Sequence, residues 1–307
     1  MRALVYKSTG SWYQVFGDDG HFYKARTKGK LRINGITSTN PIAVGDYVQM
    51  EQEQNADDYM ITAVDARRNY VNRISPHNKN QHHIVAANLD QSLLFATLKD
   101  PKTSLGFIDR FLVTCEAFHI PAILVFNKAD LYKKNELEEY DLIKSIYEKI
   151  GYKVMLVSVE KNTGLDELKA TLANKITLLS GHSGVGKSTF INHLLPHLQQ
   201  RTTDVSEWSG KGMHTTTFAE MFDLENGGKI IDTPGIRELD IADISKDELS
   251  HYFPEMRVLV NNCKFNNCLH ENEPGCAVKS AVNSGDVSEL RYISYLTIKE
   301  SIKGKAY

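Results

Sequence analysis

Short apolar stretches separated by turn residues occupy the first 70 positions of the chain. Six of them have the length and the aromatic or β-branched content of strands: Ala3–Tyr6, Trp12–Phe16, Phe22–Arg26, Leu31–Ile33, Tyr47–Glu51 and Met60–Val64. Glycine-containing turns, such as residues 17–20 and 34–35, separate these stretches. This pattern predicts a small β-barrel, for which an oligonucleotide-binding (OB) type fold is the natural candidate.

A different pattern runs from Ser92 to about Leu239, where apolar strands alternate with amphipathic helices. The expected elements are strands at 93–96, 122–126 and 154–157 and helices at 106–118, 136–150 and 165–172. Such alternation predicts an α/β domain whose parallel sheet is covered by helices.

A polar connection over residues 71–90 joins the two patterns, and two further helical stretches, 277–284 and 286–303, close the chain. We therefore expect three domains. Their boundaries are 1–70 for the barrel, 71–240 for the α/β domain and 241–307 for a small helical domain.

The composition is that of an ordinary soluble protein of two or three domains. Of the 307 residues, 41% are hydrophobic and 24% are charged, and the net charge is −2. Because the chain has no global basic field, any contact with nucleic acid must come from a local patch. No apolar run approaches the roughly 20 residues that cross a bilayer, and the N-terminus lacks a signal-peptide pattern. We expect a cytoplasmic protein without a membrane partner.

Residues 181–189 match the phosphate-loop pattern G-x-x-x-x-G-K-[ST] between an apolar strand and an apolar helix. The loop consists of Gly181, His182, Ser183, Gly184, Val185, Gly186, Lys187, Ser188 and Thr189. Its glycines let backbone N–H groups surround a phosphate at a helix N-terminus. Lys187 would reach the β- and γ-phosphates and is expected to be essential for turnover, while the Ser188 hydroxyl would bind Mg²⁺.

Asn127, Lys128, Ala129 and Asp130 follow the apolar strand 122–126, at the strand end where open α/β sheets bind ligands. A carboxylate there can accept hydrogen bonds from N1–H and the exocyclic amine of guanine. Adenine lacks both donors on that edge, so Asp130 would select guanine. The Lys128 stem can lie over the base, and Asn127 can brace the loop.

Asp232-Thr233-Pro234-Gly235 follows a third strand. Asp232 would hold Mg²⁺ and the Gly235 N–H would meet the γ-phosphate. One of the three threonines at 215–217 is expected to contact both Mg²⁺ and the γ-phosphate. We take Thr216 as the candidate, although the sequence does not distinguish among the three.

The guanine motif precedes the phosphate loop, whereas in ordinary GTPases it follows. With this order the chain resembles the circularly permuted ribosome-assembly GTPases of the RsgA (YjeQ/YloQ) family, over essentially its whole length. The resemblance implies a monomeric GTPase that acts in late maturation of the small ribosomal subunit and binds its ribosomal RNA. It also implies that binding to the subunit stimulates GTP hydrolysis. It also implies that Ser158 and Val159 form a second base-binding loop for GTP or GDP, although Val159 and Glu160 depart from the commoner Ser-Ala-Lys.

The residue after Gly235 is Ile236, where many GTPases carry a glutamine that orients the attacking water. In the family a histidine of the switch segment is a suggested substitute, which would make His214 catalytic. Met213 departs from the family's usual Gly-Arg-His without altering the histidine. That His214 only packs the switch segment is an almost equally good interpretation.

Lys24, Arg26, Lys28, Lys30 and Arg32 recur at every second position beside aromatic residues of the barrel. They would share one face of a strand, or surround a hairpin tip if Gly29 makes a turn. Cations with the aromatics Trp12, Tyr13, Phe22 and Tyr23 suit RNA, but a solvated face over core aromatics explains the pattern equally well. The family resemblance favours RNA.

Three of the four cysteines cluster in Cys263-x₄-Cys268-x-His270-x₅-Cys276. Three thiolates and an imidazole make a closed set for one structural Zn²⁺. Because the Asp232 loop leads directly into this region, we expect nucleotide state to move it, so that barrel and zinc domain grip RNA with GTP and loosen after hydrolysis.

Two other classes stay open from the residues alone. One is a phosphate-loop ATPase or kinase of metabolism, against which Asp130 argues. The other is an RNA-binding regulator with a slow guanine-nucleotide switch.

Overall fold

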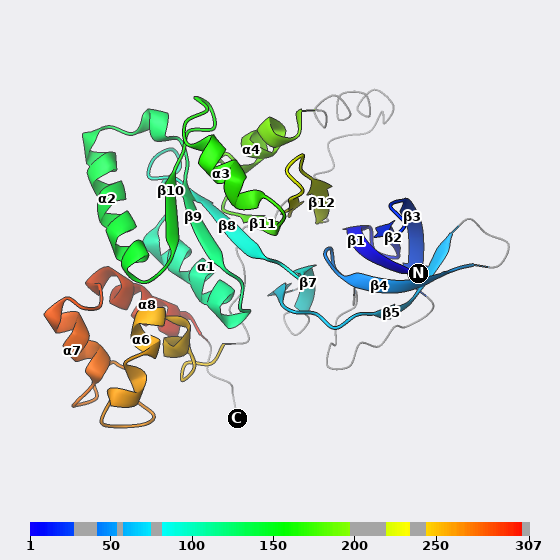
Figure 1. Ribbon diagram of the computed structural model, residues 1–307. Helices are drawn as coiled ribbons and strands as arrows, with labels where there is room; N and C mark the ends of the chain where they lie inside the picture. Colours follow the sequence, from blue (N-terminus) through cyan, green and yellow to red (C-terminus); the bar gives the residue numbers. More distant parts are fainter. Residues whose placement is uncertain (28–41, 54–57, 75–81, 197–218, 234–243, 303–307) are drawn as a thin grey trace.

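The structure is a computed structural model, and it describes residues 1–27, 42–53, 58–74, 82–196, 219–233 and 244–302. Three regions follow one another along the chain: a barrel, a sheet covered by helices and a helical C-terminal region (Figure 1). The expected strand Leu31–Ile33 lies outside the described residues.

A closed barrel of five strands forms the N-terminal region. Its strands are β1 (Arg2–Ser8), β2 (Trp12–Gly17), β3 (Phe22–Thr27), β4 (Tyr47–Gln52) and β5 (Tyr59–Val64). They pair in the order β1-β2-β3-β5-β4, and β4 returns to the first half of β1, so that the five described strands close into a barrel. Alternate side chains such as Val5, Val15 and Val48 point inward and fill the core. The predicted barrel is confirmed.

Residues 71–90 are not the polar connection that we expected. β6 (Tyr70–Ile74) and β7 (His82–Ala87) pair as an antiparallel hairpin. The hairpin joins the barrel to the central sheet, and Val71 and Ala86 are both buried in the core of the α/β region. Polar residues such as Asn72, which is buried although polar, hid the strand pattern in the sequence.

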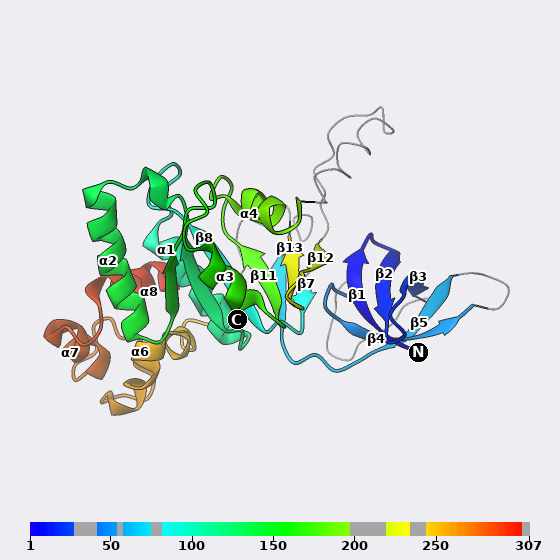
Figure 2. The same ribbon diagram turned by 45° about the horizontal axis from the view of Figure 1, so that its top comes forward.

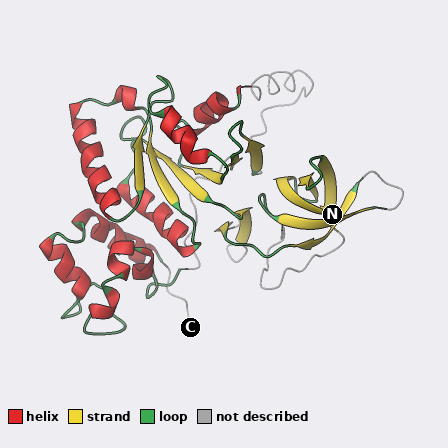
Figure 3. Ribbon diagram, viewed as in Figure 1, coloured by secondary structure: helices red, strands yellow, loops and turns green. Residues whose placement is uncertain are grey.

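The central sheet contains five parallel strands and one antiparallel strand. In spatial order these are β10 (Lys153–Leu156), β9 (Ala122–Phe126), β8 (Gln91–Ala96), β11 (Ile176–Ser180), β13 (Lys229–Asp232) and the antiparallel β12 (Glu220–Asp223). Figure 3 shows helices around this sheet, in agreement with the predicted α/β architecture. The helices are α1 (Leu105–Ala117), α2 (Lys134–Lys149), α3 (Leu165–Leu172) and α4 (Lys187–Leu194), with a short 3₁₀ turn η1 at Ala129–Leu131.

β12 of the central sheet pairs with β1 of the barrel through a single pair of residues, Lys7 opposite Glu220. The Lys7 ammonium lies 2.8 Å from the Glu220 carboxylate. Next to it, the Tyr6 hydroxyl donates to Asp223 at 2.7 Å and accepts from Lys229 at 2.7 Å. The antiparallel strands β12 and β1 thus join the central sheet and the barrel into one continuous sheet. The two strands lie side by side in Figure 2.

The C-terminal region consists of short helices packed around a small core of its own. They are η2 (Leu249–Tyr252), α6 (Pro254–Arg257), η3 (Val260–Asn262), α7 (Ala277–Ser284) and α8 (Glu289–Ser301). Val113 of α1 belongs to the same hydrophobic cluster as Phe253, Val278 and Tyr295, so α1 is shared by the two regions.

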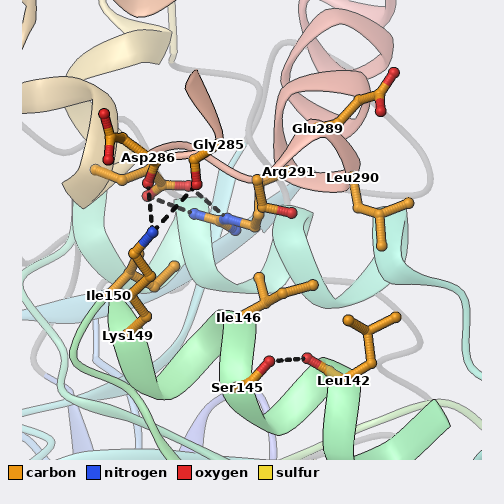
Figure 4. A pocket seen from close by; sticks show the side chains of 12 residues that line it. Leu142, Ser145, Ile146, Lys149, Ile150, Gly285, Asp286, Glu289, Leu290 and Arg291 are labelled. Atoms are coloured by element: carbon orange, nitrogen blue, oxygen red, sulfur yellow. Dashed lines mark hydrogen bonds and ion pairs between the residues drawn. The ribbon is translucent and has the colours of Figure 1, made fainter. Parts of the chain in front are cut away.

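A buried ion pair network also fixes α8 to the α/β region. Arg291 is 1% exposed and donates to Asp109 of α1 at 2.5 Å and to Glu255 of α6 at 2.7 Å, and Tyr147 of α2 donates to the same Asp109 oxygen at 2.6 Å. Burial alone would lower the pKa of Arg291, but the two carboxylates raise it well above its ordinary value. Figure 4 shows Arg291 at the back of a pocket between α2 and the start of α8, where Lys149 donates to the carbonyl of Asp286 at 2.9 Å.

Replacing Arg291 with methionine leaves the Asp109 and Glu255 carboxylates buried without a cation. We expect the urea unfolding transition of the C-terminal region to lose about 3 kcal/mol or more, because an uncompensated buried charge is strongly destabilising. Arg257→Met is the matched control, since it removes a half-exposed ion pair with Glu116 at the same interface. Its cost should stay below about 1 kcal/mol. If the two variants lost the same free energy of unfolding, the Arg291 network would not be a special source of stability.

Candidate functional site

The candidate nucleotide site lies at the carboxyl ends of the parallel strands. β11 leads into the phosphate loop, β9 into the guanine motif, β10 into Ser158 and Val159, and β13 ends at Asp232. Because these strands pair in parallel, their ends meet at one edge of the sheet although they are far apart in sequence.

The phosphate loop connects β11 to α4 and takes its shape from three glycines with positive φ: Gly181 (132°), Gly184 (84°) and Gly186 (99°). A side chain at Gly186 would collide with the amide of Asn127. The Lys187 ammonium donates to the carbonyls of Gly181 and, at 2.9 Å, His182. Val185 is fully buried, whereas Ser183, Gly184, Ser188 and Thr189 are exposed to solvent at the position where a phosphate would lie.

Asn127 holds two loops in place with the two ends of its amide. Its Nδ2 donates to the Val185 carbonyl of the phosphate loop at 2.9 Å, and its Oδ1 accepts from the Val159 N–H at 3.0 Å. The side chain is 3% exposed, so these hydrogen bonds are shielded from water. The guanine motif, the phosphate loop and the 158–159 loop are therefore joined at one residue.

The other residues of the guanine motif are arranged around this joint. Lys128 adopts a left-handed backbone (φ 65°), and its ammonium donates to the Asp100 carbonyl in the loop before α1. The Ala129 N–H donates to the Val157 carbonyl at 3.1 Å. Asp130 accepts from the Ser158 hydroxyl through one oxygen, which orients the carboxylate. Ser158 thus contacts Asp130 and Val159 contacts Asn127, and their role as a second base loop stays a prediction.

The charges of Lys187 and Asp232 interact with each other at the phosphate loop. Burial lowers the pKa of Lys187, and the charge of Asp232 opposes that shift. Burial raises the pKa of Asp232, against donation from the Thr233 backbone and the charge of Lys187. A bound anion at Lys187 and a bound cation at Asp232 would reverse these two shifts, because each would stabilise the charged form.

Several of the expected residues lie outside the described part of the chain. These are His214, Thr216 and Gly235, as well as Lys28, Lys30 and Arg32 of the basic cluster. Their roles remain predictions.

Two residues that support the site carry no motif signal in the sequence. The Tyr132 hydroxyl donates to the Asn127 carbonyl at 2.6 Å and accepts from the Leu98 N–H at 2.9 Å. Thr103 Oγ1 lies 2.7 Å from His182 Nε2. An aromatic residue two positions after Asp130 is the only sequence hint for the first, and none exists for the second.

The C-terminal cluster brings its four expected ligands together. The Sγ atoms of Cys263, Cys268 and Cys276 and a ring nitrogen of His270 lie within 4.8 Å of one another. His270 Nδ1 is 3.6 Å from Cys263 Sγ and 3.4 Å from Cys276 Sγ, so Nδ1 is the nitrogen that faces the thiols. Burial raises the pKa of Cys268 to about 12, which a divalent cation would reverse by binding the thiolate. The donor set can therefore hold one metal ion, and Zn²⁺ suits it best.

A second layer of side chains fixes the cluster to α8. Tyr292 donates to the His270 carbonyl at 2.6 Å, and Lys299 donates to the Leu269 carbonyl at 3.0 Å. Burial alone would raise the pKa of Glu273, but donation from the N–H groups of Leu269, Glu271 and Asn272 lowers it to about 2. The metal-binding loop is thus held from two sides.

The barrel presents a groove formed by β1, β2 and β3. Trp12, Phe22 and Lys24 are among its lining residues, and the Lys24 ammonium lies 4.1 Å from the centre of the Trp12 ring. Phe22 is 48% exposed, which is high for so large an apolar side chain. Tyr13 also lines the groove, but it is 3% exposed and belongs to the barrel core, as the alternative of core aromatics expects.

The site residues and the strand order define the class of this protein. In an α/β sheet of this kind, a guanine motif on β9 that precedes a phosphate loop after β11 makes a circularly permuted GTPase. A family model described as RsgA GTPase matches residues 64–242, and one described as RsgA N-terminal domain matches residues 3–60. The chain belongs to the RsgA family and is an enzyme that hydrolyses GTP.

Curated relatives match over nearly the full length. The chain is similar to the small ribosomal subunit biogenesis GTPase RsgA of Cytophaga hutchinsonii, with 52% identity covering 97% of each chain. With the protein of the same name from Flavobacterium psychrophilum it shares 51% identity, over 98% of this chain and 93% of the relative.

Two solved structures share the whole architecture. YjeQ from Thermotoga maritima is 32% identical with a TM-score of 0.79, and 99% of each chain is covered. YloQ, described as a circularly permuted GTPase, is 30% identical with a TM-score of 0.76, over 100% of this chain and 96% of that one. The helices that the structure describes include none with the length and apolar character needed to cross a membrane.

Asn127→Ala tests whether one amide holds the two loops together. The change removes both hydrogen bonds and leaves the Val159 N–H buried without an acceptor, at a cost of about 1–3 kcal/mol. We expect GTP and GDP to bind about tenfold or more weakly by fluorescence titration. Asn226→Ala is the control, because Asn226 also joins two backbone groups, Lys169 O and Gly228 N, away from the site. Equal nucleotide affinity of the two variants would refute the role of Asn127.

Proposed function

We propose that this chain is a ribosome-stimulated GTPase that acts late in the maturation of the small ribosomal subunit. It would bind ribosomal RNA and hydrolyse GTP to GDP and phosphate. The relatives that match it over nearly their full length carry the name small ribosomal subunit biogenesis GTPase. The observation that carries the chemistry is the Asn127 amide, which joins a guanine-selective motif to a phosphate loop.

In the proposed nucleotide site, each motif has one task. Asp130 accepts the N1–H and amine hydrogens of guanine, Lys128 covers the base and Ser158 orients the Asp130 carboxylate. The backbone of 181–189 and the Lys187 ammonium bind the phosphates. Mg²⁺ bound with GTP would be held by Ser188 and Asp232 and would neutralise charge on the β- and γ-phosphates.

Three residues of the proposed mechanism lie in segments outside the described residues. Thr216 would contact Mg²⁺ and the γ-phosphate, and the Gly235 N–H would meet the γ-phosphate. His214 would orient the attacking water, since Ile236 has no group that can do so. These assignments rest on motif position.

Domains at 1–70 and 241–307 would grip RNA on either side of the GTPase domain at 71–240. The barrel groove supports this, because Trp12 and Phe22 offer stacking surfaces and Lys24 offers charge for phosphate. Both flanking regions contact parts of the molecule that lead to the nucleotide: β1 pairs with β12, and α8 packs on α1. We propose that the protein works as a cytoplasmic monomer.

GTP turnover measured with and without purified small ribosomal subunits tests the proposal. We expect the subunits to raise kcat at least about tenfold, with loss of the stimulation at high salt because phosphate contacts are screened. Lys187→Ala is the control for the site and should abolish turnover in both conditions. Intact GTP binding without any stimulation would leave the GTPase standing and remove the ribosomal proposal.

The metal centre gives an independent prediction. The purified chain should carry one zinc ion by native mass spectrometry, and Cys268→Ser should lose it, because three remaining ligands no longer close the tetrahedral set. A chelator should destabilise the C-terminal region, since metal binding and folding are coupled. Cys115→Ser is the matched control, because Cys115 is buried in α1 away from the cluster. Retention of zinc by the Cys268 variant would disprove the assignment.

A further inference from the structure

The loop between β8 and α1, residues 97–104, supports the nucleotide site although it belongs to none of the nucleotide-binding motifs. Its Leu98 N–H donates to Tyr132, and its Asp100 carbonyl accepts from Lys128. Its third contact is made by Thr103, whose hydroxyl meets the side chain of His182 in the phosphate loop at 2.7 Å. Thr103 is 3% exposed and His182 is half-buried, so the contact is partly shielded from water.

The hydrogen bonds around Thr103 favour one direction for its contact with His182. Thr103 Oγ1 accepts from the Thr97 N–H at 3.0 Å, so its own proton is free to point at His182 Nε2. His182 Nδ1 lies 3.1 Å from the Ser183 carbonyl, which can only accept. In the tautomer that carries its proton on Nδ1, the ring donates to this carbonyl and Nε2 accepts from the Thr103 hydroxyl, and we take this tautomer for His182.

His182 also contacts Lys187, the cation of the phosphate loop. The carbonyl of the same His182 accepts from the Lys187 ammonium at 2.9 Å. The ring of Phe107, in the first turn of α1, packs edge-on against the His182 ring with 5.5 Å between centroids. His182 is thus held by side chains of α1 and its loop, and its backbone in turn holds Lys187.

We propose that Thr103 is a positioning residue for GTP binding, which acts through His182 on the loop carbonyls that orient the Lys187 ammonium. The proposal rests on the proposed role of the phosphate loop. Thr103 itself does not touch the nucleotide. Its effect should appear mainly in the affinity for GTP and GDP, because the hydroxyl fixes the loop before the nucleotide binds.

A double-mutant cycle of Thr103→Val and His182→Ala tests this. Thr103→Val keeps the side-chain shape and removes the hydroxyl, and we expect nucleotide to bind about fivefold more weakly, the factor that one hydrogen bond commonly contributes. Thr103→Ser keeps the hydroxyl and should restore the affinity. In the His182→Ala background, Thr103→Val should weaken binding no further, because the connection is already lost.

The melting temperature separates positioning from simple support of the fold. Thr103→Val also leaves the buried Thr97 N–H without its acceptor, so it should lower the melting temperature in the His182→Ala background as well, where its effect on affinity is gone. A loss of affinity that persists in the His182→Ala background overturns the proposal, and so does a lower melting temperature with unchanged affinity.

The tautomer of His182 is an independent test, read from ¹⁵N chemical shifts after assignment with His182→Gln. A proton on Nε2 in the native chain contradicts the proposed donation by Thr103. Lys187→Ala distinguishes this failure from a failure of the site itself. If Lys187→Ala binds GTP normally, the phosphate-loop assignment falls; if it does not bind GTP but the cycle shows no coupling, only the role of Thr103 falls.

Discussion

The buried amide of Asn127 is the interaction on which the nucleotide site depends. It joins a strand end that comes early in the chain to a phosphate loop that starts 54 positions later. A side-chain amide has a donor and an acceptor at fixed separation, so it can hold two backbone loops only at one mutual distance. The arrangement of the two motifs in space therefore does not depend on which of them comes first in the sequence.

What the permutation does change is how the flanking regions are attached. β12 pairs with β1 of the barrel, and α1 shares its packing with the C-terminal region. The buried Arg291 network makes the second attachment specific, because three elements meet at one guanidinium. The α/β region thus lies between two regions that are attached to it through regular elements, β12 and α1.

Local pattern predicted much of this molecule, and long-range pairing accounts for what it missed. Apolar runs such as 122–126 and the glycines of 181–186 specify strands and a phosphate loop by local rules. The hairpin β6–β7 was missed because Asn72 interrupts its apolar pattern and the partners that bury Val71 come from elsewhere. Thr103 meets His182 across 79 positions, and Tyr6 meets Asp223 across 217. Such contacts follow from the strand order of the sheet, which no local pattern encodes.

The pairing of β1 with β12 also has a consequence for solubility. A sheet that ended at β12 would present a free edge, and unpaired backbone groups of an edge strand can recruit extended segments of other chains. β1 covers part of this edge, and the ion pair of Lys7 with Glu220 places charges beside it. The N-terminal region thus occupies part of an edge that would otherwise be open to pairing with another chain.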